Sequence, residues 1–177
     1  MTSGIRRQHK KFKQPLRLFD KERIDEENAF AEKYGLKNKK EIWKMEFSIK
    51  KIRDQAKGLI TADESERKAF IERLAKKGLI KAGAEIDDVL AMTKENLVER
   101  RLQTLVFRKG FAHTAKEARQ MIVHRKVMVG DRIVNIPSYS VAIAEEKSVK
   151  VVPSKPKKKK ESIMDEAKTK AAAEGAK

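Results

Sequence analysis

The stretch from Glu99 to Tyr139 constrains the fold most, because about forty residues there hold the patterns of two short helices and a hairpin. Apolar residues recur at helical spacing over 98–106, and Gly110 follows where a left-handed residue favours the end of a helix. Residues 127–129 and 132–134 are typical of strands around a two-residue turn. Polar side chains are expected outside the apolar stripe of the first helix: Arg100, Gln103, Thr104 and Arg108.

The second helix of this module has its own start signal. Thr114 and Glu117 are spaced as a capping box, in which the Thr114 hydroxyl accepts from the Glu117 amide and the Glu117 carboxylate reaches back to the cap amide. The box predicts a helix from Ala115. Its inner side would bury Ala118, Met121 and Ile122, and its outer side would carry Lys116, Arg119, Gln120 and His124.

Positive charge is concentrated in the same stretch. Between Glu99 and Arg132 there are nine Lys or Arg against three acids. Such an excess favours phosphate as the ligand and therefore an RNA-binding module. The nine are Arg100, Arg101, Arg108, Lys109, Lys116, Arg119, Arg125, Lys126 and Arg132.

The segment ERRLQTLVFRKGFAHTAKEARQMIVHRKVMVGDRIVNIPSY resembles the RNA-binding domain of the small-subunit ribosomal protein S-four family. Upstream, FDKERIDEENAFAEKYGLKNKKEIWKMEFSIKKIRDQAKGLI is similar to the helical domain of its archaeal and eukaryotic branch. The resemblance implies a structural, non-enzymatic constituent of the cytoplasmic small subunit that binds its ribosomal RNA early in assembly. It further implies a place at the messenger RNA entry region, a contribution to translational accuracy, an S-five-type neighbour and no homo-oligomer.

Two alternatives remain, because similar modules are appended to pseudouridine synthases, some tyrosyl-tRNA synthetases and a stress-response RNA chaperone. An RNA-modifying enzyme would need a positioned Asp, or a nucleophile and base, in the rest of the chain. The lysine-rich helical segment there has no such constellation. A ribosome-associated chaperone would instead bind substoichiometrically and under stress.

Composition supports a polyanionic partner. The 177 residues include 43 Lys or Arg and 26 Asp or Glu, for a net charge of +17. No stretch approaches the roughly twenty apolar residues of a spanning helix, and we expect neither a signal peptide nor a membrane partner. The lack of Cys excludes disulfides and thiolate zinc sites, while His113 and His124 are too few for a metal site. No cofactor is expected.

The fold expected is α+β: a mainly helical N-terminal domain and a small α/β RNA-binding domain, in which two short helices pack on a small, mostly antiparallel sheet. The expected ranges are a basic arm over 1–18, a helical domain over 19–98, an S-four-type domain over 99–152, and a lysine-rich disordered tail over 153–177. Helices are expected to end at Gly35, Gly58, Gly78 and Gly110. Residues 140–143 and 148–152 are predicted as two further strands.

Helix starts are also signalled in the helical domain. Asp20 is a plausible cap for the first helix, and Asn38 with Glu41 resembles a second capping box. The helix that follows, with Ile42, Met45, Ile49, Ile52 and Ala56 at alternating three and four spacing, is predicted as the main core helix.

Thirteen module residues are predicted to contact RNA: Arg100, Arg101, Arg108, Lys109, Thr114, Lys116, Arg119, Gln120, His124, Arg125, Lys126, Arg132 and Ser138. Arg100 and Arg101 point about 100 degrees apart on a helix, so one is expected to face protein and one RNA. Five arm residues are further candidates: Arg6, Arg7, Lys10, Lys11 and Lys13. The run Lys157–Lys160 is either a phosphate-seeking extension or a solubilising tail.

Two positions carry alternatives. Many relatives have Gly where this chain has Arg125, so either the local geometry differs or a phosphate contact offsets about a kcal/mol of left-handed strain. The loop Asn135–Tyr139 is either a turn in which Pro137 directs the chain and Tyr139 packs at the core edge, or, as the resemblance implies, a place where Ser138 donates to phosphate.

Overall fold

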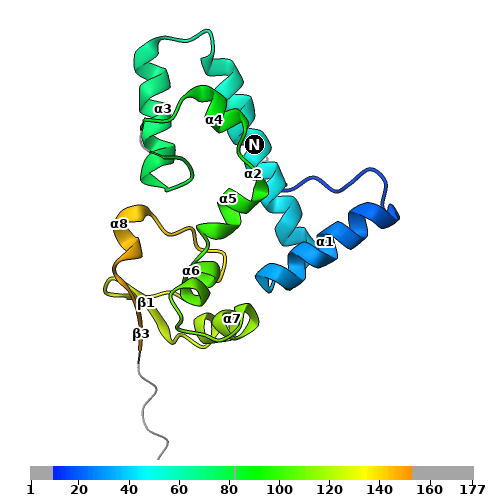
Figure 1. The fold of residues 1–177 in the computed structure, drawn as a ribbon, viewed down its shortest axis with the longest axis vertical. Coiled ribbons are helices and arrows are strands. Elements are labelled where there is room, and N and C mark those ends of the chain that lie inside the picture. Colours follow the sequence, from blue (N-terminus) through cyan, green and yellow to red (C-terminus); the bar gives the residue numbers. More distant parts are fainter. Residues whose placement is uncertain (1–9, 82, 153–177) are drawn as a thin grey trace, which may run out of the picture.

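The computed structural model describes residues 10–81 and 83–152, which form a mainly helical part followed by a small α/β module (Figure 1). This is the α+β fold expected from the sequence. The lysine-rich tail, Lys157–Lys160, Arg6 and Arg7 lie outside the described residues. No helix among the residues described is long and apolar enough to cross a membrane.

The long helix α2 (Lys39–Leu59) is the central helix of the helical part. Its buried stripe of Ile42, Met45, Ile49 and Ala56 contributes to two separate cores. Near its start it packs with α1 (Lys21–Tyr34), where Phe30 and Tyr34 are buried. Near its end it packs with α3 (Glu64–Lys76), where Phe70 and Leu74 are buried.

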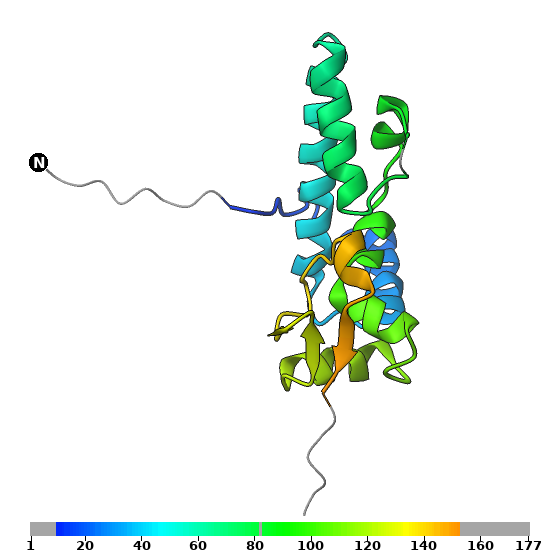
Figure 2. The ribbon, with the colours of Figure 1, turned by 90° about the vertical axis from the view of Figure 1, so that its left-hand side faces the viewer.

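Two short helices bring the chain back along α2. Helix α4 (Ile86–Leu90) closes the distal core with Val89, and α5 (Lys94–Glu99) completes the proximal core with Val98. Both lie against α2, so the helical part is elongated and two layers thick (Figure 2).

Three of the four glycines that were predicted to follow the end of a helix do so, and the fourth does not. Gly35, Gly78 and Gly110 all have positive φ just after a helix. Gly58 instead lies inside α2, which continues through Leu59. A Cβ added at Gly58 would meet nothing within 4 Å, so no close approach requires a glycine here.

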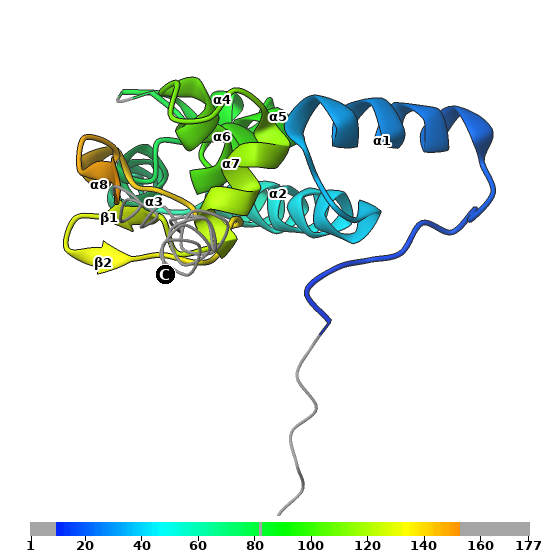
Figure 3. The same cartoon turned by 90° about the horizontal axis from the view of Figure 1, so that it is seen from below.

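The α/β module contains α6 (Leu102–Arg108), α7 (Ala115–Val123), β1 (Val127–Val129), β2 (Arg132–Ile133), α8 (Ile143–Glu146) and β3 (Val149–Val151). The strands form an antiparallel sheet in the order β2-β1-β3. Its core joins Leu102 and Val106 of α6 to Ile122 of α7 and to the sheet. Seen from below, α1 and the β1–β2 hairpin lie on opposite sides of α7 (Figure 3).

The first helix of the module differs from the prediction. The run over 98–108 is broken, because Arg101 is extended and bridges to Ser140, and Val141 donates to the Arg100 carbonyl at 3.0 Å. Helix α6 therefore starts at Leu102 with a new rotation. As a result Gln103 and Thr104, expected outside the apolar stripe, are buried.

The strand predicted over 140–143 is wrong, whereas β3 forms within the predicted 148–152. Residues 143–146 instead make one helical turn, α8. The Glu145 carboxylate accepts from the Ala142 amide and from the Tyr139 hydroxyl, which stabilises the start of that turn. Alternation alone did not distinguish this turn from a strand.

Residues 10–18, the described part of the basic arm, contact the protein's own helices. Phe12 stacks on Trp43 with ring centroids 6.4 Å apart, and Lys40 lies over the Phe12 ring. Arg23 of α1 donates to the carbonyls of Arg17 and Leu18 at 3.0 Å. These contacts place the described arm residues beside α2.

Candidate nucleic-acid interface

Helix α7 is fixed at its start by the predicted cap. The Thr114 hydroxyl accepts from the Glu117 amide at 3.1 Å. The Glu117 carboxylate accepts from the amide of His113 at 2.7 Å, one residue earlier than expected. The first bond satisfies one of the amides that a helix start leaves without a partner, and the second ties the residue before the cap to the helix.

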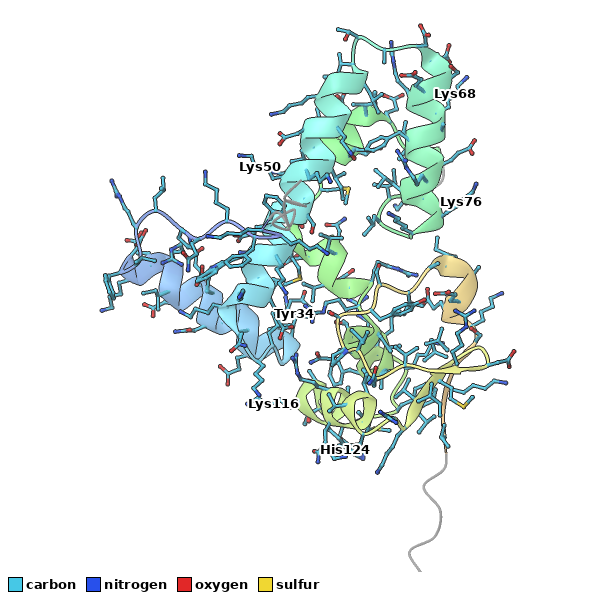
Figure 4. All side chains as sticks on the ribbon, turned by 180° about the vertical axis from the view of Figure 1, so that it is seen from behind. Tyr34, Lys50, Lys68, Lys76, Lys116 and His124 are labelled. Atoms are coloured by element: carbon cyan, nitrogen blue, oxygen red, sulfur yellow. The ribbon has the colours of Figure 1, made fainter. Side chains whose placement is uncertain are left out.

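The outer face of α7 is polar and accessible. Lys116, Gln120 and His124 are exposed, and Figure 4 shows Lys116 and His124 projecting from the same helix. The opposite face is apolar, with Ala118 and Ile122 fully buried and Met121 packed against them. The helix therefore presents cationic and hydrogen-bonding groups to an external ligand.

The corner after α7 extends this face. Arg125 has φ +58, so the left-handed geometry is retained without Gly. Such a backbone costs a non-Gly residue roughly 1–2 kcal/mol. Its amide donates to the Ile122 carbonyl and that of Lys126 to the Met121 carbonyl, and both side chains are exposed. Arg132 is exposed on the adjoining hairpin.

Arg119 was predicted on the exposed side of α7, and this prediction is wrong. It is half-buried and donates to both carboxylate oxygens of Glu41, at 2.8 and 3.3 Å. Arg101, which is 8% exposed, donates to the same carboxylate at 2.5 Å. One carboxylate of α2 thus holds two guanidinium groups of the module; we call this set, Glu41, Arg101 and Arg119, the Glu41 clamp.

The clamp explains why the capping box predicted at Asn38 and Glu41 is not formed. Asn38 makes no side-chain cap bond, and the Glu41 carboxylate, which would have to reach back to the Asn38 amide, instead points to the module. Burial raises the pKa of Glu41, but the hydrogen bonds from Arg119 and Arg101 outweigh burial and leave the pKa below its ordinary value. Glu41 is therefore held ionised at neutral pH.

Gln103 forms a second link between the two parts. Its side chain is buried, and its amide nitrogen lies 3.0 Å from the carbonyl oxygens of Tyr34, Gly35 and Ala115. Its oxygen accepts from Arg119 at 3.3 Å. The end of α1 is thereby fixed against the start of α7.

Arg100 also faces protein, so the expectation that one of Arg100 and Arg101 faces RNA is wrong. Arg100 donates to Glu146 at 2.8 Å and to the Val141 carbonyl at 2.9 Å. A Cβ added at Gly78 would lie 2.8 Å from the Arg100 guanidinium carbon. The C-terminal end of α3 therefore rests on this arginine.

Two further predicted residues also have protein partners. Lys109 is half-buried and contacts the Glu146 carbonyl. Arg108 is exposed and forms a surface ion pair with Glu99 at 2.5 Å. Surface pairs of this kind are weak, so Arg108 remains available to a stronger anion.

A groove lies beside the clamp, between α2 and the loop 135–140. It is lined by Lys40, Lys44, Arg119 and Ser138, among others. The structure is compatible with both interpretations of that loop. Tyr139 packs at the core edge, and Ser138 is exposed in the groove. Phe12 of the arm stacks on Trp43 of α2, and Lys40 lies over its ring. This contact places three exposed lysines of the arm near α2: Lys10, Lys11 and Lys13.

Glu41 and Gln103 were missed by the sequence analysis. Their partners lie 60 to 78 residues away for Glu41 and up to 69 for Gln103. No local spacing signals such a contact. Within the described part of the chain, no group of three His, Asp or Glu is placed to hold a metal ion.

The module and its exposed basic face define a protein built around an S4 RNA-binding domain. In agreement, the family profile of the S4 domain matches residues 100–146. The similarity to known proteins extends well beyond that domain.

The chain is similar to three archaeal proteins named small ribosomal subunit protein uS4. The Methanothermobacter thermautotrophicus protein is 42% identical over 87% of this chain and 92% of its own length. Those of Methanococcus aeolicus and Thermoplasma acidophilum are 45% and 44% identical, over 85% and 80% of this chain and 88% and 74% of their own. The chain belongs to the uS4 family.

Proposed function

We propose that the protein is a structural, non-enzymatic constituent of the small ribosomal subunit that binds small-subunit ribosomal RNA. The observation that carries the proposal is the exposed face of α7 and the corner after it. Lys116 lies near the capped helix start, Gln120 lies further along the helix, and His124, Arg125 and Lys126 follow its last turn. Free amides and the helix dipole favour phosphate at such a start. The uS4 names of the relatives support the ribosomal context.

Recognition would rest on RNA shape and phosphate geometry. The deep, narrow major groove of A-form RNA does not admit a helix pair, so α7 would lie against backbone phosphates. Release of counterions would supply much of the affinity. The proposal includes four further exposed residues as phosphate contacts: Arg108, Thr114, Arg132 and Ser138.

The arginines that face protein have a different role in this proposal. Arg101 and Arg119 would act as positioning residues that hold the helical part against the module through Glu41. Arg100 and Lys109 would instead position Glu146 of α8 within the module. A fixed spacing between the α7 face and the lysines of the arm and α2 would let one RNA junction engage both. Binding early in assembly, a place near messenger RNA entry with an effect on accuracy, and an S-five-type neighbour complete the proposal.

The test is RNA binding by matched Lys→Gln variants of the full chain. Lys116→Gln removes a cation from the α7 face, whereas Lys76→Gln removes one from the exposed last turn of α3. We expect Lys116→Gln to weaken binding to small-subunit RNA and to make the slope of log affinity against log salt shallower by roughly 0.7–0.9. Lys76→Gln should do neither.

Equal effects of the two variants would contradict the proposed face. Equal affinity for small-subunit and large-subunit RNA in the unmodified chain would contradict the specificity. Circular dichroism of each variant separates these outcomes from a loss of fold.

A further inference from the structure

A groove with acidic walls lies at the distal end of the helical part, between α3 and the start of α4. Figure 1 shows these helices at the opposite end of the molecule from α7. The groove lining includes Glu64, Ile71, Glu72, Glu85, Ile86 and Asp87.

The charge of this end differs from that of the rest of the chain. From Glu64 to Leu90, six Lys or Arg are balanced by six Asp or Glu. The whole net charge of +17 therefore resides outside this segment. A surface that bound RNA phosphate would be expected to share the excess of cations.

Three of the four acids that line the groove form no ion pair among the described residues. Among described residues, none forms an ion pair with Glu72, Glu85 or Asp87, all of which are exposed. Of the two cations in the lining, Lys68 is engaged with Glu64 at 2.7 Å, and Arg67 donates twice to the Ala62 carbonyl. The groove therefore has a negative character within a strongly cationic protein.

The groove also offers apolar surface. Ile86 is half-buried and packs against the distal core, so part of its side chain remains accessible. Ile71 is likewise half-buried, although it lies outside the set of residues that build that core. An aliphatic side chain between two carboxylate walls suits an amphipathic ligand whose polar groups are cationic.

We infer that this groove docks a basic segment of a second protein, in which Lys or Arg residues flank an aliphatic side chain. Charge complementarity identifies the occupant: cationic side chains would face Glu72, Glu85 and Asp87, and the aliphatic one would cover Ile71 and Ile86. RNA is disfavoured because its phosphates would face these carboxylates. Since α7 lies at the other end, RNA and protein can be bound at once.

The first test uses a fluorescent peptide of alternating lysine and leucine with the full chain in solution. Binding is expected despite the +17 charge of the protein, which would repel a cationic peptide elsewhere. The double variant Glu72→Lys/Asp87→Lys should lower the affinity about tenfold or more. The milder Glu72→Gln/Asp87→Asn should lower it less, and it serves if the double reversal impairs folding.

The second test identifies the occupant inside the subunit. Because the chain has no cysteine, Lys68→Cys and Lys116→Cys can each carry a single photo-crosslinker. The Lys68 position lines the groove and should crosslink to a protein segment rich in Lys or Arg, whereas the Lys116 position should crosslink to RNA.

Peptide binding that is absent, or unchanged by charge reversal, would overturn the inference. So would crosslinks from position 68 to RNA, to a second copy of this chain or to its own tail. A missing RNA crosslink from position 116, with peptide binding intact, would instead count against the proposed RNA face.

Discussion

At the scale of single residues, Glu41 determines how the two parts of the molecule meet. Its carboxylate accepts from both Arg101 and Arg119, and all three side chains are at least half-buried. A charge in such a place is stabilising only while its partners remain, since removing one leaves the others desolvated and unpaired. Replacement at this position should therefore affect stability more than an exposed charge does.

We predict that Glu41→Gln lowers the free energy of unfolding by about 1–3 kcal/mol at neutral pH. The folded-state pKa of Glu41 lies below its unfolded value, so its contribution is present above the ordinary value of 4.5 and is lost as pH falls through the folded pKa. The difference between variant and parent should accordingly shrink in acid. Urea unfolding at neutral and acidic pH measures both values.

Glu32→Gln is the matched control, because Glu32 is exposed on α1. It should change stability little at either pH. A deficit of Glu41→Gln that persisted unchanged in acid would contradict the role of its ionised form.

At the scale of elements, α7 shows why local signals were reliable. Its start depends on Thr114 and Glu117, three residues apart, and a helix cap needs nothing more distant. The helix ends at Gly35, Gly78 and Gly110 were predictable for the same reason. The predictions that were wrong also have a physical reason, because they depended on distant contacts. Arg101 is extended, not helical, since it pairs with Ser140. The Glu41 side chain does not cap its own helix, since it binds partners at least 60 residues away.

The cap of α7 leads to a prediction for that element. Thr114→Ala should lower the stability of the full chain by about 1 kcal/mol, because the Glu117 amide loses its acceptor. The thermal midpoint should fall by about 2–4 °C. Thr114→Ser retains the hydroxyl and should stay close to the parent; equal losses in the two variants would show that the methyl group, not the cap, matters.

At the scale of the whole molecule, the contacts between the helical part and the module include three: the Glu41 clamp, the Gln103 amide and the contact of Arg100 with Gly78. Two of the three need a glycine. Gly35 has φ +62, and a Cβ there would lie 2.9 Å from Ala115 and 3.1 Å from the Gln103 nitrogen. The close approach is therefore incompatible with a larger residue.

We predict that Gly35→Ala destabilises the protein by at least about 2 kcal/mol, from the left-handed backbone and the clash with Ala115 together. Gly58→Ala makes the same chemical change in open space within α2 and should stabilise by about 0.5–1 kcal/mol. Denaturant midpoints of the two variants give opposite signs if the interface is tight as described. Two shifts of the same sign would contradict it.

The Gln103 and Glu41 contacts also set an order of events during synthesis. Both cores of the helical part are complete once Val98 has left the ribosome, and they include neither Arg101 nor Arg119. Until then the Glu41 carboxylate and the Tyr34 and Gly35 carbonyls have no module to bind. Contacts that close 60 to 78 residues of chain form late. The helical part therefore folds first, with the Glu41 carboxylate and the two carbonyls still without their module partners. The module binds these groups when it folds later.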